Sequence, residues 1–205
     1  MPVSKEQKMD GWVSVTEVLD TFIPKQLLAW YLKTGAREAK RLSTAAMKIG
    51  SRVDELIQED ITNGSYKLSS KDPIEVKNCM EAWESFKRDY QPKIQHVQVE
   101  CKDEQQKVIG HIDLIIDSRI VDVKCASSIK DNYWLQVSKY AHMIYKGGIL
   151  KTGILRLDKN LGTYQLVTNE QANKDPYECL KVYDGLLSAY RYYNQPKGQE
   201  DVCQQ

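Results

Sequence analysis

The segment between Val108 and Lys124 constrains the fold of this chain more than any other. It holds two runs rich in β-branched residues, VIGHIDLII and IVDVK, on either side of the polar turn Asp117-Ser118-Arg119. β-Branched residues favour strands, and a short polar link between two such runs is typical of a hairpin. The sequence therefore predicts two adjacent antiparallel strands here.

Alternation along the second strand predicts which side chains share a face. Residues two apart on a strand point the same way, so Asp122 and Lys124 should emerge together while Val121 and Val123 point to the apolar side. On the first strand the same rule places Asp113 on one face. Its neighbours Ile112 and Leu114 are expected on the other face.

Paired in its natural register, this hairpin brings the carboxylates of Asp113 and Asp122 toward one point. Two neighbouring carboxylates repel each other unless a cation lies between them or one of them takes a proton. Oxygen ligands of this kind favour Mg²⁺ or Mn²⁺. The pair is therefore a candidate metal site.

A lysine beside such a pair adds chemistry to it. A divalent cation activates water and neutralises charge on a phosphate, and the ammonium of Lys124 can orient the nucleophile or stabilise the transition state. Because Asp and Lys are common, a solvated hairpin surface is the alternative interpretation of D-x-K. The motif ends an apolar strand, follows a strand with another acid and precedes a helix. This context favours a metal-dependent site that cleaves phosphodiester bonds.

Three motifs in order resemble a known family. Gly110-His111-Ile112-Asp113, then Asp122-Val123-Lys124, then Gln136 with Tyr140 are similar to the GxxD, DxK and QxxxY motifs of the RecB-like branch of the PD-(D/E)XK nuclease superfamily. The opening segment WVSVTEVLDTFIPKQLLAWYLKTG also resembles phage-encoded members, including exonucleases, so the likeness spans residues 12–145.

The resemblance implies roles for these residues. It implies that Asp113 and Asp122 bind the metal, that the backbone carbonyl of Val123 is a further ligand, and that Lys124 assists catalysis. Gln136 and Tyr140, four residues apart and so on one helix face, would lie near the site or the DNA strand.

Two positions depart from the family pattern. Members carry an upstream G-[ST]-x-x-H, and the matching segment, residues 50–54, ends in Asp54 instead of histidine. An aspartate can still bind a metal, and a third carboxylate would favour a two-ion site; a solvated helix acid is the alternative. The D-x-K is usually followed by a small hydroxyl residue, whereas Cys125 stands here and Ser127 comes later. Arg52 and Ser127 are the remaining candidate contacts to substrate.

Length and composition predict one domain. With 205 residues, 41% of them apolar, the chain can bury one substantial core. We expect that domain over residues 1–195, with a mainly helical part at 1–92, the sheet and motifs at 94–193, and a flexible tail at 196–205. Mean hydropathy is −0.54, and no long apolar run or signal peptide is recognisable. The expected location is the cytoplasm, that of a bacterial host if the chain is phage-encoded, with no membrane association.

The cysteine pattern and the lack of a nucleotide-binding motif limit which cofactors are expected. Five scattered cysteines without a C-x-x-C pair argue against structural zinc, disulfides and an iron-sulphur cluster. No G-x-x-x-x-G-K-[ST] occurs, so no ATP site is expected. Mg²⁺ or Mn²⁺ is the expected cofactor.

Charge is balanced overall but not locally. The net charge of +1 gives no global footprint for nucleic acid. The stretch from Lys33 to Arg52 nevertheless has six basic residues against one acid, Glu38. Such a helix could track a phosphate backbone beside the site, and a solvated helix face explains it equally well. The basic residues are Lys33, Arg37, Lys40, Arg41, Lys48 and Arg52.

Caps and hydrophobic periodicity predict an α/β chain in the order helix, three strands, helix, strand. This order matches the αβββαβ core that the family resemblance implies, that of restriction-endonuclease-like proteins, with a mixed β-sheet flanked by helices. Helices are expected at 14–22, 24–35, 36–61, 73–92, 132–146 and 176–193. Strands are expected at 96–101, 108–116, 120–124, 152–157 and 163–167.

The function expected from these observations and the resemblance is a metal-dependent DNA nuclease, acting as an exonuclease in phage-type recombination, replication or repair. A structure-specific endonuclease and a catalytically silent DNA-binding subunit of a recombination complex are the alternatives. DNA is the expected partner, with a recombinase, helicase or single-strand-binding protein as candidate protein partners. The sequence leaves the oligomeric state open.

Overall fold

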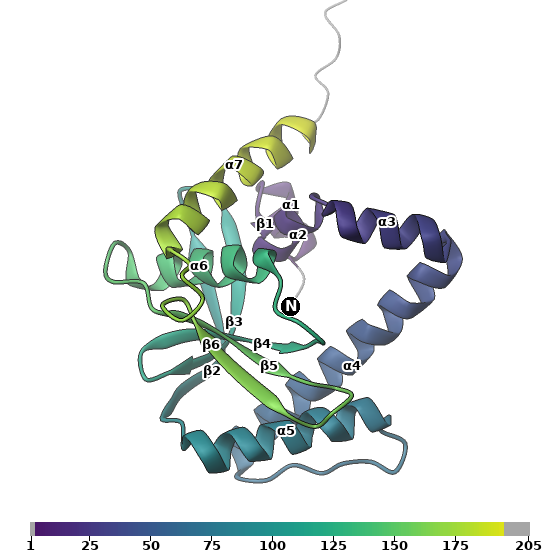
Figure 1. Ribbon diagram of the computed structural model, residues 1–205. Helices are drawn as coiled ribbons and strands as arrows, with labels where there is room; N and C mark the ends of the chain where they lie inside the picture. Colours follow the sequence, from purple (N-terminus) through teal and green to yellow (C-terminus); the bar gives the residue numbers. More distant parts are fainter. Residues whose placement is uncertain (1–2, 195–205) are drawn as a thin grey trace, which may run out of the picture.

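The computed structural model describes residues 3–194, apart from the side chain of Gln26. A six-stranded mixed sheet has helices on both faces (Figure 1), so the predicted α/β fold class is confirmed. The tail predicted at 196–205 lies outside the described residues. No helix in the described part of the chain is long and apolar enough to cross a membrane.

The elements follow the predicted order with small shifts at their ends. The helices are α1 Lys5–Met9, α2 Val15–Asp20, α3 Lys25–Thr34, α4 Ala36–Asn63, α5 Ile74–Tyr90, α6 Asp131–Tyr145 and α7 Pro176–Asn194. The strands are β1 Val13–Ser14, β2 Ile94–Asp103, β3 Val108–Ile116, β4 Arg119–Cys125, β5 Thr152–Leu157 and β6 Tyr164–Thr168.

The N-terminal elements differ most from the prediction. Helix α1 and the short strand β1 were not predicted, although Ser4 and Gln7 form a complete capping box at the start of α1. Helix α2 is capped by the Ser14 hydroxyl as expected, but it ends at Asp20. The chain tightens into i→i+3 hydrogen bonds at Thr21 and Phe22, because Pro24 disfavours helical backbone just before it.

The sheet divides beside the predicted site. Strand β3 pairs with antiparallel β2 on one edge. On its other edge it pairs with parallel β1 at Val108 and Ile109, and with β4 only from Leu114 to Ile116. Among the described residues, no strand pairs with 110–113 on this second edge. Strands β3 and β4 therefore form a fork, and β4 continues as a parallel neighbour of β5.

The fork breaks the strand alternation expected from the sequence. Ile112 packs in the core that contains α6 and α7, whereas Leu114 packs in the opposite core with α4 and α5. The prediction that both point to one face is therefore wrong. The reason is local: the β2–β3 ladder omits the pair Gln98–Asp113, and Gln98 has a φ of 51°. Irregular pairing at this point turns the strand about Asp113.

Helix α4 has two unlike halves. Its second half supplies Val53, Leu56 and Ile57 to the core between the sheet and α5. Along residues 36–48 only Ala39 is buried. Figure 1 shows α3 and this first half of α4 standing away from the sheet. The same rigid helix thus connects an exposed arm to the core.

Candidate functional site

The two predicted acids lie in the fork between β3 and β4. Asp113 Oδ2 accepts a hydrogen bond from the backbone N–H of Val123 at 2.8 Å. The carboxylate thereby replaces the strand-to-strand bond that is missing where β3 leaves β4. Asp122 is only 2% exposed, and its Oδ1 accepts a bond from Lys124 Nζ at 2.8 Å. Sequence reasoning predicted this convergence, but not the fork that produces it.

Burial and mutual charge make this group of acids costly to ionise. Burial raises the pKa of Asp113 well above its ordinary value, and the charge of Asp122 raises it further. Burial also raises the pKa of Asp122, and the ammonium of Lys124 does not fully offset that effect. Asp122 Oδ2 is buried without a hydrogen-bond partner in the described structure. A buried, unsatisfied carboxylate oxygen beside a second carboxylate is a place where a cation lowers the free energy.

Asp54 reaches the same electrostatic environment from α4. Burial raises its pKa to about 6, an effect opposed by Lys124 and strengthened by Asp122 and Glu55. Within residues 3–194, however, no three His, Cys, Asp or Glu side chains are arranged as a group that could hold a metal ion. The structure therefore brings Asp54 near the two strand acids without joining it to them in one set of ligands.

The helix after β4 closes one side of the site. Gln136 Nε2 donates to Tyr140 OH at 3.1 Å, and both residues are buried. Burial raises the pKa of Tyr140 most, and the charges of Asp122 and Asp113 raise it further. The Tyr140 ring lies so close to Gly110 that a Cβ there would come within 2.3 Å of Cε1. The glycine of the GxxD motif therefore has a packing role: it admits this ring.

Two residues near the site were not predicted. Lys124 Nζ lies 5.2 Å from the centre of the Tyr133 ring, a distance suited to a cation–π contact. Tyr133 precedes Gln136 by three residues and Tyr140 by seven, so helical spacing alone could have identified it. Asp20, at the end of α2, is also near enough for the charge of Lys124 to lower its pKa, although burial leaves that pKa raised. No sequence signal pointed to Asp20.

The two predicted substrate contacts outside this cluster have other surroundings. Arg52 binds Asp72 at 3.1 Å and Glu55 at 3.2 Å. It leaves α4 two residues before Asp54, which in a helix means nearly the opposite side. The structure does not bring Arg52 to the acids, so its predicted contact with substrate has no support from the arrangement. Ser127 is exposed in the loop after β4, and its carbonyl accepts a bond from Arg156 at 3.4 Å.

The residues present fit a divalent cation. The buried carboxylate of Asp122, one oxygen of which has no partner among the described residues, and the half-buried carboxylate of Asp113 form an oxygen-rich pair of the kind that Mg²⁺ and Mn²⁺ prefer. The intervening residue, Val123, is fixed by its N–H bond to Asp113 and by pairing of β4 with β5. Its carbonyl is therefore on a rigid strand between the two acids.

Comparisons with known proteins were made with both the sequence and the fold. No protein-family model matches the sequence, and no curated protein resembles it significantly. Similar solved structures include an alkaline exonuclease, LHK-Exo, from Laribacter hongkongensis, at 12% identity over 93% of this chain and 95% of that chain, with a TM-score of 0.43. The same exonuclease in complex with dAMP, at the same identity and coverage, gives 0.40.

A third similar structure is that of a protein called SSO0001, at 10% identity over 70% of this chain and 75% of that chain, with a TM-score of 0.35. At these identities and TM-scores the likeness carries no argument about function. The chemistry has to be inferred from the residues of the fork.

Proposed function

We propose that this protein is a divalent-metal-dependent nuclease that hydrolyses phosphodiester bonds in DNA. One observation carries the proposal: the half-buried Asp113 and the buried Asp122 converge in the fork, Lys124 is bound to Asp122 at 2.8 Å, and within residues 3–194 no donor reaches Asp122 Oδ2. A fold that withdraws two neighbouring carboxylates from water with an incomplete set of hydrogen bonds loses stability. Binding of a cation by the pair would compensate for that loss.

Each residue has a role that follows from its place. Asp113 and Asp122, with the carbonyl of Val123, would hold the cation. When bound, the cation supplies activation of water and neutralisation of phosphate charge. Lys124, kept at the edge of the pair by Asp122, would orient the attacking water or donate to a phosphate oxygen. Gln136 and Tyr140 would position the strand beside the acids, and Asp54 is proposed as an added ligand that moves inward.

The reaction is a hydrolysis. The water oxygen forms a bond to phosphorus, the bond from phosphorus to the leaving sugar oxygen breaks, and that oxygen takes up a proton. Exonuclease action in recombination, replication or repair is the more specific proposal. It rests on the resemblance of the ordered motifs and on the lack of an ATP-binding or sequence-reading motif in the chain. Mg²⁺ or Mn²⁺ is the proposed cofactor.

The decisive experiment uses end-labelled linear DNA and circular DNA, single-stranded and duplex, each with Mn²⁺ or with EDTA. An exonuclease degrades the linear forms only, in the presence of Mn²⁺. Cleavage of the circles would instead establish an endonuclease. The Asp113→Asn variant is the control for a contaminating nuclease, because it changes only the proposed metal site.

A binding measurement separates an inactive subunit from an enzyme. A ligand that binds only the folded chain raises its melting temperature. We expect Mn²⁺ to raise the Tm of the native chain and to leave the Tm of Asp113→Asn nearly unchanged. No Tm shift together with no cleavage of any substrate would overturn the proposal in favour of a silent DNA-binding subunit.

A further inference from the structure

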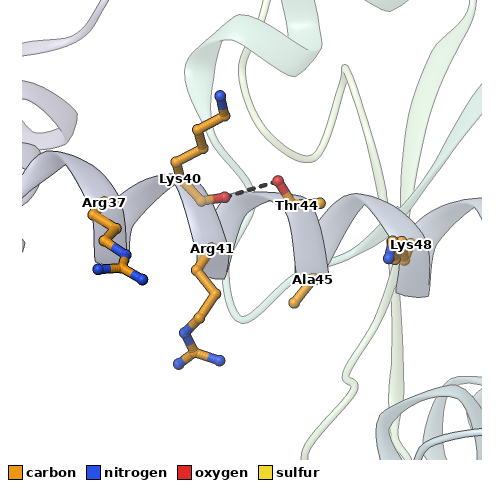
Figure 2. Close-up of a pocket in the computed structure, with 6 residues that line it drawn as sticks. All are labelled: Arg37, Lys40, Arg41, Thr44, Ala45 and Lys48. Carbon is orange, nitrogen blue, oxygen red and sulfur yellow. Dashed lines mark hydrogen bonds between the residues drawn. The ribbon is translucent and has the colours of Figure 1, made fainter.

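The first half of α4 has an open hollow on its outer face. The hollow has a volume of about 440 Å³, and no acidic side chain from the part of the chain that the structure describes lines it. Thr44 and Ala45 are its small residues, and the Thr44 hydroxyl is bound to the Lys40 carbonyl at 2.8 Å. Figure 2 shows Arg37 and Arg41 extending to one side of α4 and Lys40 to the other. We call this surface the basic face; its residues are Arg37, Lys40, Arg41, Thr44, Ala45 and Lys48.

Most of the positive charge on the basic face is uncompensated. Arg41 binds Glu38 through two bonds of 2.7 and 2.8 Å on the exposed surface, where such pairs contribute little and exchange readily. Among the described residues, no carboxylate forms an ion pair with Arg37, Lys40 or Lys48. Three unpaired cations along this stretch of α4 repel one another, and a polyanion is the ligand that relieves this repulsion.

The geometry points to the phosphate backbone of DNA as that ligand: we propose that the basic face holds the substrate on its way to the fork. This inference rests on the proposed function. Lys40 lies fourteen residues before Asp54, close to four turns, so the two side chains leave α4 on the same side. Helix α4 is continuous from the basic face to Asp54, which lies near the acids of the fork.

The length of the basic face suits a strand of DNA. At about 1.5 Å per residue, Arg37 and Lys48 are roughly 16 Å apart along α4, which corresponds to about five phosphates of one duplex strand. Lys48 comes within roughly 9 Å of Asp54 along the axis. The arm would therefore contact the backbone a few nucleotides from the bond that is cleaved. It would contribute affinity and no chemistry.

The test is binding without cleavage. The triple variant Arg37→Gln, Lys40→Gln and Lys48→Gln removes the unpaired charges and keeps good helix-forming residues. A fluorescent strand of about 20 nucleotides and its duplex serve as probes in EDTA, with anisotropy as the readout. We expect a Kd raised at least tenfold near 0.1 M salt. The slope of log Kd against log salt should fall by about 2, since three phosphate contacts are lost at ~0.7 each.

A second triple variant controls for net charge. Lys77→Gln, Lys93→Gln and Lys151→Gln remove three exposed cations from α5 and from the residues just before β2 and β5. We expect its Kd to stay within about twofold of the native value, with an unchanged salt slope. Equal weakening in both triple variants would overturn the basic face as a site, because net charge alone would then explain the effect.

Cleavage measurements separate this inference from the proposed function. In Mn²⁺, the basic-face variant should have a raised KM and a kcat within about twofold of native. Native cleavage together with unchanged Kd in the basic-face variant would overturn the inference and leave the nuclease intact. If the native protein does not cleave DNA but the basic-face variant binds it more weakly than the native protein does, the basic face is supported and the proposed nuclease function is overturned. If the native protein binds phosphatidylserine vesicles but not DNA, the proposal of DNA as the ligand of the basic face is overturned in favour of a membrane surface.

Discussion

Two lysines in this protein, the buried Lys139 and the half-buried Lys124, each bind an aspartate at 2.8 Å, and Lys124 is the one in the candidate site. The Lys139 side chain is 1% exposed, and its Nζ donates to Asp103 and also to Gln106, the latter at 2.6 Å. Burial raises the pKa of Asp103, but the bonds from Lys139 and from the Gln106 N–H outweigh it and leave that pKa below 3.8. Lys124 binds Asp122 at the same distance, yet burial keeps the pKa of Asp122 raised.

The difference comes from what surrounds each pair. Asp103 accepts from both Lys139 and the backbone, so its two oxygens are satisfied. Asp122 has one oxygen without a partner among the described residues, and a second carboxylate, that of Asp113, lies beside it. A saturated pair stabilises a fold, whereas an excess of buried negative charge destabilises it until a cation binds. Contact distance alone therefore does not distinguish a saturated structural ion pair from the pair in the candidate site.

The largest effect should come from removing charge in the fork. Asp113→Asn keeps an oxygen that can accept from the Val123 N–H but removes one negative charge. We expect cleavage to fall about a thousandfold or more, on the order of 4 kcal/mol of transition-state stabilisation. The free energy of unfolding in EDTA should stay equal or rise, because a buried charge is lost. Cleavage rates and chemical denaturation in EDTA measure the two effects.

A matched control for this variant lies on the same hairpin. Asp117 is exposed in the β3–β4 turn with a φ of 50°, a conformation that asparagine tolerates well. Asp117→Asn makes the same chemical change outside the fork, so cleavage should remain near native. Cleavage that survives in Asp113→Asn would remove this acid from the mechanism. A clear loss of stability in EDTA would instead make the Asp113 carboxylate structural.

The second largest effect should appear at the saturated pair. Asp103→Asn leaves the buried ammonium of Lys139 without its counter-charge, which costs about 3 kcal/mol of stability. Cleavage per folded molecule should remain near native, because neither residue belongs to the fork. Denaturation curves and rates at a temperature where both proteins are folded test this. Loss of cleavage in a fully folded variant would contradict the structural role.

The pair Lys139–Asp103 also predicts a dependence of stability on pH. The pKa of Asp103 is lower in the folded chain than its ordinary value of 3.8, and the charge of His142 also lowers it. The unfolded chain therefore binds more protons as the pH falls toward and below 4, so the pair's contribution is present above that pH and lost below it. Asp103→Asn should flatten this part of the stability profile.

The sequence predicted which residues meet in the fork better than how the fork is built. D-x-K and the alternation rule identified Asp122 and Lys124, because residues two apart on any strand share a face. The alternation rule failed at Asp113, because β2 and β3 do not pair regularly there and β3 turns. The sequence does not show at which residue the pairing of two strands is interrupted. The structural pair could not be predicted either, since Lys139 meets Asp103 only through packing of α6 against the β2–β3 hairpin.

Gly110 offers a smaller and more specific test of the site's packing. A methyl group at this position would meet the Tyr140 ring at 2.3 Å, so Gly110→Ala should displace the ring and its bond from Gln136. We expect a loss of about 1–3 kcal/mol, typical of overpacking in a core. The double variant Gly110→Ala with Tyr140→Leu should recover part of that loss in denaturation experiments. Additive losses would show that the two positions do not interact.

The smallest predicted effect concerns how Lys124 is held. Tyr133 presents its ring to the ammonium at 5.2 Å, whereas the structural Lys139 has the ring of Tyr183 at 5.6 Å. Tyr133→Phe keeps the ring, so cleavage should stay near native, while Tyr133→Leu removes about 1 kcal/mol of cation–π attraction and should slow kcat about fivefold. A matching loss in Tyr133→Phe would assign the effect to the hydroxyl. If kcat is unchanged in Tyr133→Leu, the ring adds nothing to the positioning of the Lys124 ammonium. The ion pair with Asp122 then positions Lys124 by itself.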